Sequence, residues 1–481
     1  MYRPPSKRKQ LIQRTAVYSF MTIAVVGLVT VLVLVMLGYQ FNRNEGRIEQ
    51  GGLLQFDSRP NGANVTIDGN AFGTRTPSKT TLSSGQHFIT MTRTGYQTWQ
   101  KSVDIVPGSV TWLNYSRLIP VDLQPALVAD FSKVSSTAVS QDAKWMALKE
   151  NVADASIRLA NLAGDDVALK TIEIPTTVYT KAKKHIFTIE KWDPDSRYIL
   201  VQHTYDGKRE WLVVDAENVG ASQNVSRLLD IDASKVVFSD GDSRILYVQI
   251  GTDIRRINLN EATMSRPLVD NAADFSLYKA STIVFTTTQD TSTKQRSVGF
   301  YKEGSEKPQI VRSYDSNKNV SLHLALGEYF GDTYFAISHG KNIDVLEGDL
   351  NNVANVKSVA SFAATAAVDH LSIVTNGRFI IAQHGAAYTT YDLEFKKSTS
   401  TSLKGAAVVS DELRWLDDYT VWSDRDGTVR LYEFDGANQH DIMTVVPGLS
   451  VTLSPNAEYL YGVNKSDNGA YHLQRVRLIL P

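Results

Sequence analysis

The stretch Asp195–Val201 (DSRYILV) joins a polar turn to a strongly apolar strand, and this pattern returns along the chain. Asp242–Val248 (DSRILYV) and Asn376–Ala382 (NGRFIIA) are close copies of it. Five more diverged copies lie at residues 142–148, 279–285, 331–337, 417–422 and 456–461. A second apolar strand follows each copy, as Trp211–Val214 (WLVV) follows the first of these stretches. Repeats of about 40–50 residues with about four strands each are typical of a β-propeller.

The repeats occupy residues 120–481 and predict an all-β ring of eight blades. Seven blades is the alternative, because the copies at 279–285 and 331–337 fit the pattern weakly. A single short sheet cannot bury both of its faces, whereas blades stacked around a ring bury them and protect the strand edges. The segments Trp192–Arg197 (WDPDSR) and Leu453–Glu458 (LSPNAE) resemble the TolB-like, WD-related propeller repeat. The Trp-Asp dipeptide itself is absent from the expected strand ends.

The N-terminal region combines a basic tail with a long apolar run. The basic residues are Arg3, Lys7, Arg8, Lys9 and Arg14, and residues 15–41 contain no charge. A membrane-spanning helix needs about 20 apolar residues, and the apolar region of a signal peptide has only about 7–15. The run ends in Leu37–Phe41 (LGYQF), without the small residues of a cleavage site. We therefore expect a single-pass transmembrane helix at 15–41, in contact with membrane lipid.

The positive-inside rule places the basic tail, residues 1–14, in the cytoplasm. No later stretch is long and apolar enough to span a bilayer, so the rest of the chain is expected to be extracytoplasmic. Residues 42–50 are expected to form a polar linker. Short alternating runs broken by Gly, Pro and Asn then predict a small β-sandwich at residues 51–119, with a hairpin at Asp68-Gly69.

The order of motifs in residues 51–119 resembles the PEGA domain of bacterial and archaeal surface proteins. The motifs are Pro60–Ala63 (PNGA), Val65–Gly69 (VTIDG), Gly73–Pro77 (GTRTP), Leu82–His87 (LSSGQH) and Gly95–Tyr96. The signature Pro-Glu-Gly-Ala reads Pro-Asn-Gly-Ala here, which keeps the Gly-Ala turn. The resemblance implies an extracytoplasmic, non-catalytic β module of the bacterial cell envelope and names no ligand.

Composition excludes several classes of function. The chain of 481 residues has no cysteine, which excludes disulfides, thiolate metal sites and a cysteine nucleophile. Its net charge of -1 offers no electrostatic basis for binding nucleic acid. Motifs for phosphate, dinucleotide, serine-hydrolase or zinc-protease sites are absent from the sequence. We therefore predict no catalytic residue and no cofactor.

Three histidines are weak candidates for a metal or ligand site. His203, His339 and His384 occupy similar positions just past the second strand of the second, fifth and sixth copies. This position places them toward one face of a propeller, and the last two on neighbouring blades. A metal site needs at least three converging ligands and supporting hydrogen bonds, so polar residues at strand ends are the simpler interpretation.

The leading hypothesis is a membrane-anchored binding or scaffold protein, not an enzyme, whose propeller face binds a protein or an envelope polymer. One alternative is a hydrolase or lyase of polysaccharides, which carboxylates of raised pKa clustered in the central channel would favour. Another alternative is an envelope-assembly factor that contacts other membrane proteins. A concave pocket with clustered charges on the propeller would be the most informative observation.

Overall fold

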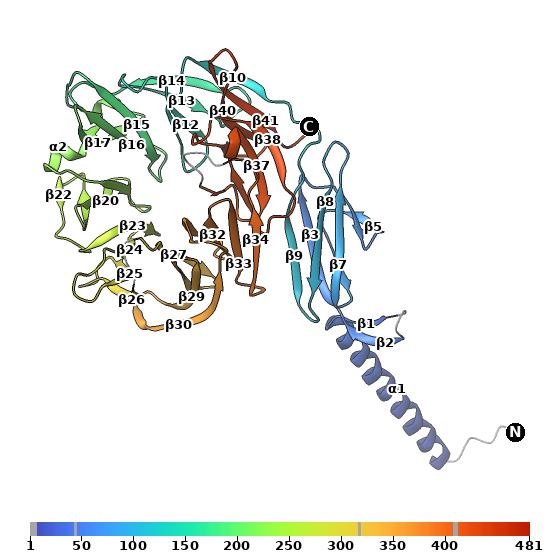
Figure 1. The fold of residues 1–481 in the computed structure, drawn as a ribbon. Helices are drawn as coiled ribbons and strands as arrows, with labels where there is room; N and C mark the ends of the chain where they lie inside the picture. The colour runs from blue at the N-terminus through green and yellow to red at the C-terminus, as the bar shows by residue number, and fades with distance from the viewer. Residues whose placement is uncertain (1–6, 43–45, 316–318, 407–411) are drawn as a thin grey trace. The chain divides into compact units, whose positions relative to one another are not determined.

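The computed structural model describes residues 7–42, 46–315, 319–406 and 412–481. The chain divides into two compact units, Met1–Asp122 with Ile479–Pro481, and Leu123–Leu478. Apart from the N-terminal helix, both units are built almost entirely of β-strands (Figure 1).

Helix α1 (Lys7–Met36) begins earlier and ends earlier than the membrane segment expected at 15–41. Its part Gln10–Met36 is long and apolar enough to cross a membrane, and none of it is buried against protein. Gly38 ends the helix in the left-handed region, with φ of 81°. Strands β1 (Tyr39–Asn42) and β2 (Arg47–Gln50) then pair antiparallel, where the sequence suggested the end of the transmembrane helix at 15–41 and a polar linker at 42–50.

The rest of the first unit is the predicted β-sandwich, with sheets in the orders β6-β3-β9 and β5-β4-β7-β8. Its strands are β3 (Gly52–Arg59), β4 (Asn64–Ile67), β5 (Asn70–Arg75), β6 (Ser78–Leu82), β7 (Gly85–Thr92), β8 (Trp99–Ile105) and β9 (Val110–Arg117). Asp68 and Gly69 both have positive φ, as the tight hairpin predicted from this dipeptide requires. Alternate residues of β3 point into the core, where Leu54 and Phe56 pack against Met91 and Trp99.

The second unit consists of eight four-stranded antiparallel sheets among the described residues, so the expected number of eight blades is confirmed. Blades 1 and 2 are β11 (Ser136–Val139), β12 (Trp145–Lys149), β13 (Ser156–Asn161), β14 (Ala168–Glu173) and β15 (His185–Trp192), β16 (Tyr198–Tyr205), β17 (Lys208–Asp215), β18 (Gln223–Asn224). Blades 3 and 4 are β19 (Lys235–Phe238), β20 (Ile245–Ile250), β21 (Asp253–Asn258), β22 (Thr263–Met264) and β23 (Ala272–Tyr278), β24 (Thr282–Thr287), β25 (Gln295–Lys302), β26 (Gln309–Asp315). Blades 5 and 6 are β27 (Leu322–Tyr329), β28 (Asp332–His339), β29 (Asn342–Asp349), β30 (Asn352–Ala363) and β31 (His370–Ile373), β32 (Phe379–His384), β33 (Ala387–Asp392), β34 (Lys397–Ser402). Blade 7 is β35 (Arg414–Trp415), β36 (Thr420–Ser423), β37 (Thr428–Glu433) and β38 (His440–Thr444).

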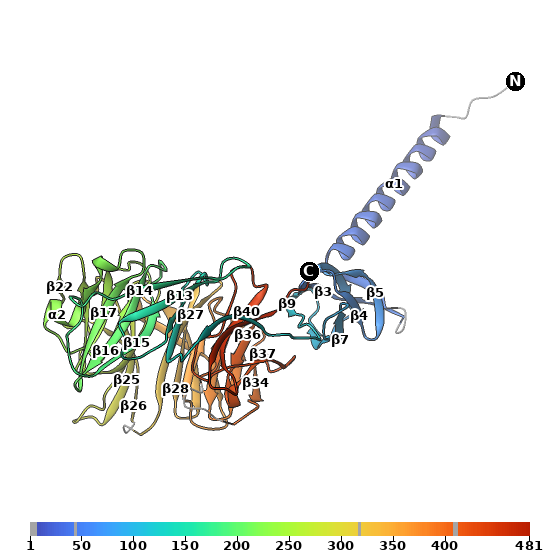
Figure 2. The same cartoon turned by 90° about the horizontal axis from the view of Figure 1, so that it is seen from above.

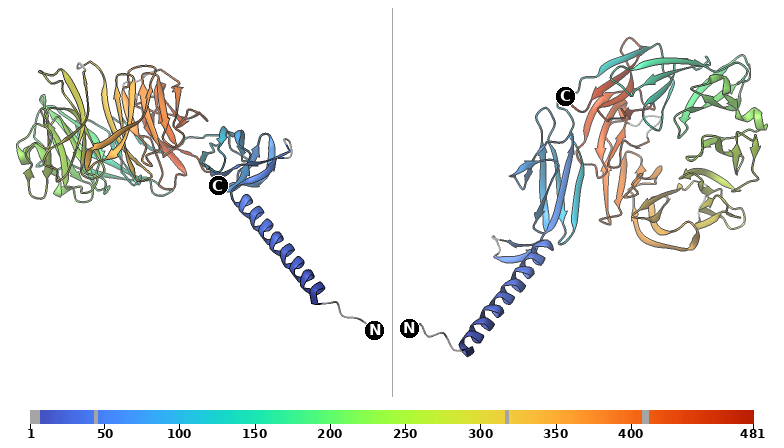
Figure 3. Two further views of the ribbon diagram at one scale, coloured as in Figure 1. Left: turned by 90° about the horizontal axis from the view of Figure 1, so that it is seen from below. Right: turned by 180° about the vertical axis from the view of Figure 1, so that it is seen from behind.

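Blade 8 closes the ring by combining the two ends of the second unit. Its order is β10-β41-β40-β39, so β10 (Ala126–Phe131) is the outer strand beside β41 (Tyr471–Arg477). The remaining strands are β39 (Thr452–Leu453) and β40 (Tyr459–Lys465). Figure 2 shows the strands of the ring from its side, and Figure 3 shows the closing blade from behind. Phe131 of β10 and Leu473 of β41 share one buried core, which joins the first and last strands of the propeller.

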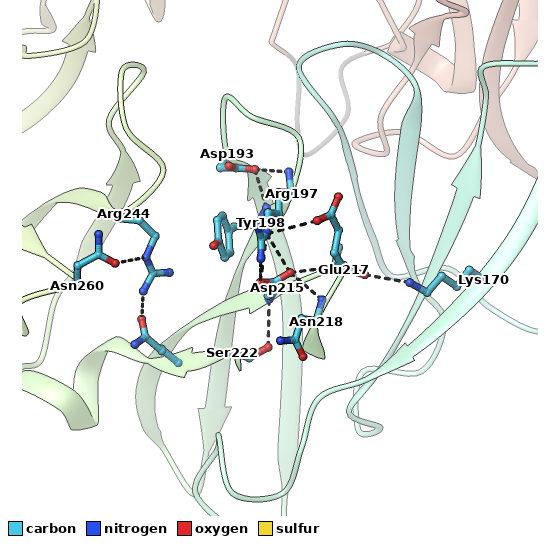
Figure 4. A network of polar contacts seen from close by, with 12 residues as sticks. Lys170, Asp193, Arg197, Tyr198, Asp215, Glu217, Asn218, Ser222, Arg244 and Asn260 are labelled. Atoms are coloured by element: carbon cyan, nitrogen blue, oxygen red, sulfur yellow. Dashed lines mark hydrogen bonds and ion pairs between the residues drawn. The ribbon is translucent and has the colours of Figure 1, made fainter. Parts of the chain in front are cut away.

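The repeated turn between the first two strands of a blade has a structural role (Figure 4). Asp193 accepts backbone hydrogen bonds from Arg197 and Tyr198, both at 2.7 Å. The Arg197 guanidinium donates to Asp215 at the end of the third strand, at 2.7 Å. Arg378 and Asp392 make the equivalent pair in blade 6, also at 2.7 Å, and there both side chains are buried. These repeated polar residues therefore stabilise the blades.

A candidate binding cavity in the propeller channel

A cavity of about 430 Å³ opens among the first strands of blades 4, 5 and 6, at β23, β27 and β31. Five ionisable side chains line it: Asp274, His323, Asp369, His370 and Glu412. The apolar part of the lining includes Phe275, Phe285, Leu324 and Ile381. The cavity therefore combines polar groups with an apolar surface, as small-molecule sites commonly do.

The blade repeat explains how residues far apart in sequence meet here. Asp274, His323 and His370 each lie near the start of the first strand of their own blade. First strands of successive blades run side by side around the channel, and β27 and β31 are in direct contact. Equivalent positions of neighbouring blades therefore come together although about 50 residues separate them along the chain.

Two of the cavity carboxylates, Asp274 and Asp369, accept hydrogen bonds from the protein. The Asp274 carboxylate accepts a hydrogen bond from Lys235 Nζ at 2.7 Å, so one positive charge already balances it. Asp369 Oδ2 accepts the backbone N–H of Gly385 at 2.6 Å, which fixes Asp369 beside the turn after β32. The buried amide of Gln383 accepts the Leu413 N–H at 2.7 Å and so holds the segment that carries Glu412 against the cavity.

His323 acts as a neutral hydrogen-bonding group at neutral pH. Burial lowers its pKa, which keeps the imidazole uncharged. Its Nε2 lies 3.1 Å from the Val368 carbonyl oxygen. A carbonyl oxygen can only accept, so Nε2 carries the proton and Nδ1 remains as an acceptor.

The cavity is electronegative. Three carboxylates line it, and one of them, Asp274, is paired with the Lys235 ammonium. Such an acidic lining is complementary to a positively charged ligand.

The three histidines singled out from the sequence lie on blades 2, 5 and 6 and have different surroundings. His203 is fully buried inside β16, where its Nδ1 lies 2.8 Å from Glu210 Oε1 and its Nε2 lies 2.9 Å from His185 Nδ1. His339, the last residue of β28, stacks on Tyr314 at 4.7 Å between ring centroids.

His384, the last residue of β32, lies 3.1 Å from both the Thr365 and the Thr389 hydroxyl. Over the described ranges, no group of three or more histidines and carboxylates could hold a metal ion. None of the three histidines lines the cavity. The repeat pattern in the sequence is clearest in the second strand of each blade. Asp274, His323 and His370 belong to first strands, so the repeat pattern did not single them out.

Comparison with known proteins identifies one segment of the first unit. Residues 52–118 match the PEGA domain family. This match confirms the resemblance drawn from the Pro-Asn-Gly-Ala motif and its neighbours. No curated protein sequence matches the chain.

Solved structures share the propeller fold at low sequence identity. The Dos1 propeller is 12% identical, with a TM-score of 0.47, and the alignment covers 74% of this chain and 95% of that one. Dipeptidyl peptidase 4 of Porphyromonas gingivalis is 12% identical, with a TM-score of 0.49, 74% of this chain and 60% of that one being covered. An oligogalacturonate lyase in complex with manganese is 11% identical, with a TM-score of 0.40 and coverage of 74% and 98%. These similarities concern the fold alone.

Proposed function

We propose that this chain is a membrane-anchored, extracytoplasmic binding protein of the cell envelope, and that its propeller cavity binds a ligand bearing a primary ammonium group. The observation that carries the proposal is the cavity of about 430 Å³ with three carboxylates, only one of them paired with a lysine, and the neutral His323. Helix α1 supplies the anchor.

The proposed recognition follows from hydrogen-bond chemistry. An ammonium group has three donors and no acceptor. Asp369, Glu412 and Nδ1 of His323 are acceptors on the cavity lining, whereas Asp274 is already paired with Lys235. Each hydrogen bond to a charged group contributes about 1.5–3 kcal/mol. The apolar lining beside them fits the carbon skeleton that carries the amine.

Two sources share this chemistry, lysine side chains of a partner protein and amino sugars of an envelope polymer. Calorimetric titration of the full-length protein in mild detergent with tetraglucosamine and with a trilysine peptide separates the sources. The N-acetylated form of each probe is its matched control. We expect binding of one or both amines and none of the acetylated forms. Equal binding of an amine and its acetylated form would refute the ammonium proposal.

Glu412→Gln tests the location of the site. Losing this charge should weaken binding of the amine probe about tenfold or more, since one charge-assisted hydrogen bond is lost. Glu306→Gln is the matched control, because Glu306 is an exposed acid outside the cavity. Equal affinities of the two variants would place the binding elsewhere.

A polysaccharide hydrolase or lyase is the second candidate, because three carboxylates line one cavity. Mass spectrometry of tetraglucosamine after incubation with the protein decides between the two. Shorter products that disappear in Glu412→Gln would favour the enzyme, and an intact probe favours binding alone.

The proposed orientation has the N-terminus in the cytoplasm, because basic residues such as Arg8 and Arg14 precede the apolar part of α1. Topology reporters fused at residue 5 and at residue 481 test it. A cytoplasmic C-terminus would overturn the extracytoplasmic assignment.

A further inference from the structure

The turn between β8 and β9, residues 106–109, is tied to the end of the apolar helix by a short chain of hydrogen bonds. The Gly51 N–H donates to the Gly38 carbonyl, directly after α1, at 2.9 Å. The Gly108 N–H donates in turn to the Gly51 carbonyl at 2.9 Å. The turn is therefore two hydrogen bonds away from the residue that ends the helix.

Side-chain contacts and glycines strengthen this connection. Gln50 donates from its side chain to the Leu37 carbonyl at 2.9 Å. A Cβ at Gly52 would lie 2.6 Å from the Val106 carbonyl oxygen, closer than real Cβ atoms approach. Only glycine lets β3 begin so near the turn. Residues 50–53 and 106–109 consequently form one packed layer at the helix end.

Large apolar side chains are exposed in this layer and at the start of β9. Val106 is 48% exposed, Val110 42% and Trp112 44%, although all lie in a folded domain with its own core. Val110 and Trp112 are on the outer side of β9, because side chains alternate along a strand. Their neighbours across the sheet are Leu53 and Gln55, which are uncharged. The polar residue Asn114 comes next on the same side.

The length of the helix locates this layer relative to a bilayer. The uncharged part of α1, residues 15–36, is about 33 Å long at about 1.5 Å per residue. The hydrocarbon core of a membrane is about 30 Å thick. If Arg14 marks one boundary of the core, the end of the helix lies at the other boundary. The turn bonded to that end then lies among the lipid headgroups.

We propose that Val106, Val110 and Trp112 form a second membrane contact, the collar tip, which inserts into the headgroup layer of the bilayer beside α1. Tryptophan prefers this interface because its ring is apolar and its N–H can still be solvated. The contact rests on α1 spanning the membrane, and it fixes the orientation of residues 47–122 against the lipid surface.

The absence of cysteine makes the chain a clean background for site-directed spin labelling. The full-length protein is reconstituted in phosphatidylcholine–phosphatidylglycerol liposomes, and accessibility to oxygen and to a water-soluble nickel chelate is measured. Val106→Cys and Val110→Cys report on the collar tip. Val121→Cys is the matched control, since Val121 is 67% exposed and its N–H is bonded to Gly95 at the far end of the domain. Val26→Cys, 59% exposed on α1, reports on the anchor.

We expect the ratio of oxygen to nickel accessibility to be highest at 26, intermediate at 106 and 110, and lowest at 121. A ratio at 106 and 110 as low as at 121, with a high ratio at 26, would overturn the collar tip and leave the anchor intact. Nickel accessibility at all four positions would refute the anchor and the collar tip together. An unchanged unfolding midpoint shows that each labelled variant is folded, and either tip position alone is sufficient for the decision.

Discussion

Glu210 is a buried carboxylate that depends on its neighbours for its charge. Burial opposes ionisation, but hydrogen bonds from His203 and from Thr180 outweigh it and lower the pKa of Glu210 to about 2. A carboxyl with a lowered folded-state pKa stabilises the fold above its unfolded value of 4.5, and this contribution is lost as the pH falls toward 2.

We therefore predict that Glu210→Gln lowers the free energy of unfolding at pH 7 by on the order of 3 kcal/mol. The difference from wild type should shrink between pH 4.5 and pH 2, because the wild-type carboxyl becomes protonated there. Guanidinium titrations across this range measure it. The exposed Glu306→Gln should show no such pH-dependent difference, and a constant difference for Glu210→Gln would contradict the prediction.

Part of this residue-scale network could have been derived from the sequence. The Asp206-Gly207 turn fixes the register of β16 and β17, so that His203 lies opposite Glu210. The cavity could not be derived in that way. Asp369 and Glu412 line one cavity because different blades pack together. No local sequence pattern indicates which residues of different blades will face the same cavity.

The sequence predicted the positions of the strands better than it predicted which strands pair. The second and third strands of all eight repeats lie where the turn-plus-strand pattern placed them, including the weak copies around Ile283 and Phe335. Pairing of β10 with β41 was not predicted, because more than 300 residues separate the two strands and β10 carries no signal of its partner. The pairing of β1 with β2 was also missed, since most of β1 was assigned to the transmembrane helix and β2 to a polar linker.

Closure by β10 can be tested with a covalent link. Asp130 and His472 lie directly opposite each other in β10 and β41, and their side chains form an exposed pair. We predict that Asp130→Cys with His472→Cys forms a disulfide, because no other cysteine competes. The bond should stabilise the propeller by about 2–4 kcal/mol and raise its Tm by about 3–5 °C.

Scanning calorimetry of the oxidised and reduced double variant measures this effect, and each single variant is a control for the loss of the Asp130–His472 pair. Failure of the two thiols to pair under oxidising conditions would show that β10 does not close the ring.

On the scale of the whole chain, the last three residues belong to the same compact unit as residues 1–122. Leu480 packs against the core of that unit, and its N–H donates to the Tyr96 hydroxyl at 2.6 Å. The sequence gives no sign of this contact, because Leu480 follows the final propeller strand without a turn signal. The domain matched at residues 52–118 is therefore completed by the other end of the chain.

We predict that Leu480→Ala destabilises this domain selectively. Losing a half-buried leucine should cost about 1–2 kcal/mol, so amide exchange in β3, β7 and β8 should accelerate about 5- to 30-fold. Hydrogen-exchange mass spectrometry of the full chain measures both units at once. Exchange in the propeller strands should stay unchanged, because Leu480 packs outside their cores.

Leu169→Ala, at an exposed position in β14, is the matched control and should leave residues 52–118 unaffected. Equal exchange of Leu480→Ala and wild type in β3, β7 and β8 would mean that the C-terminal residues do not stabilise the domain.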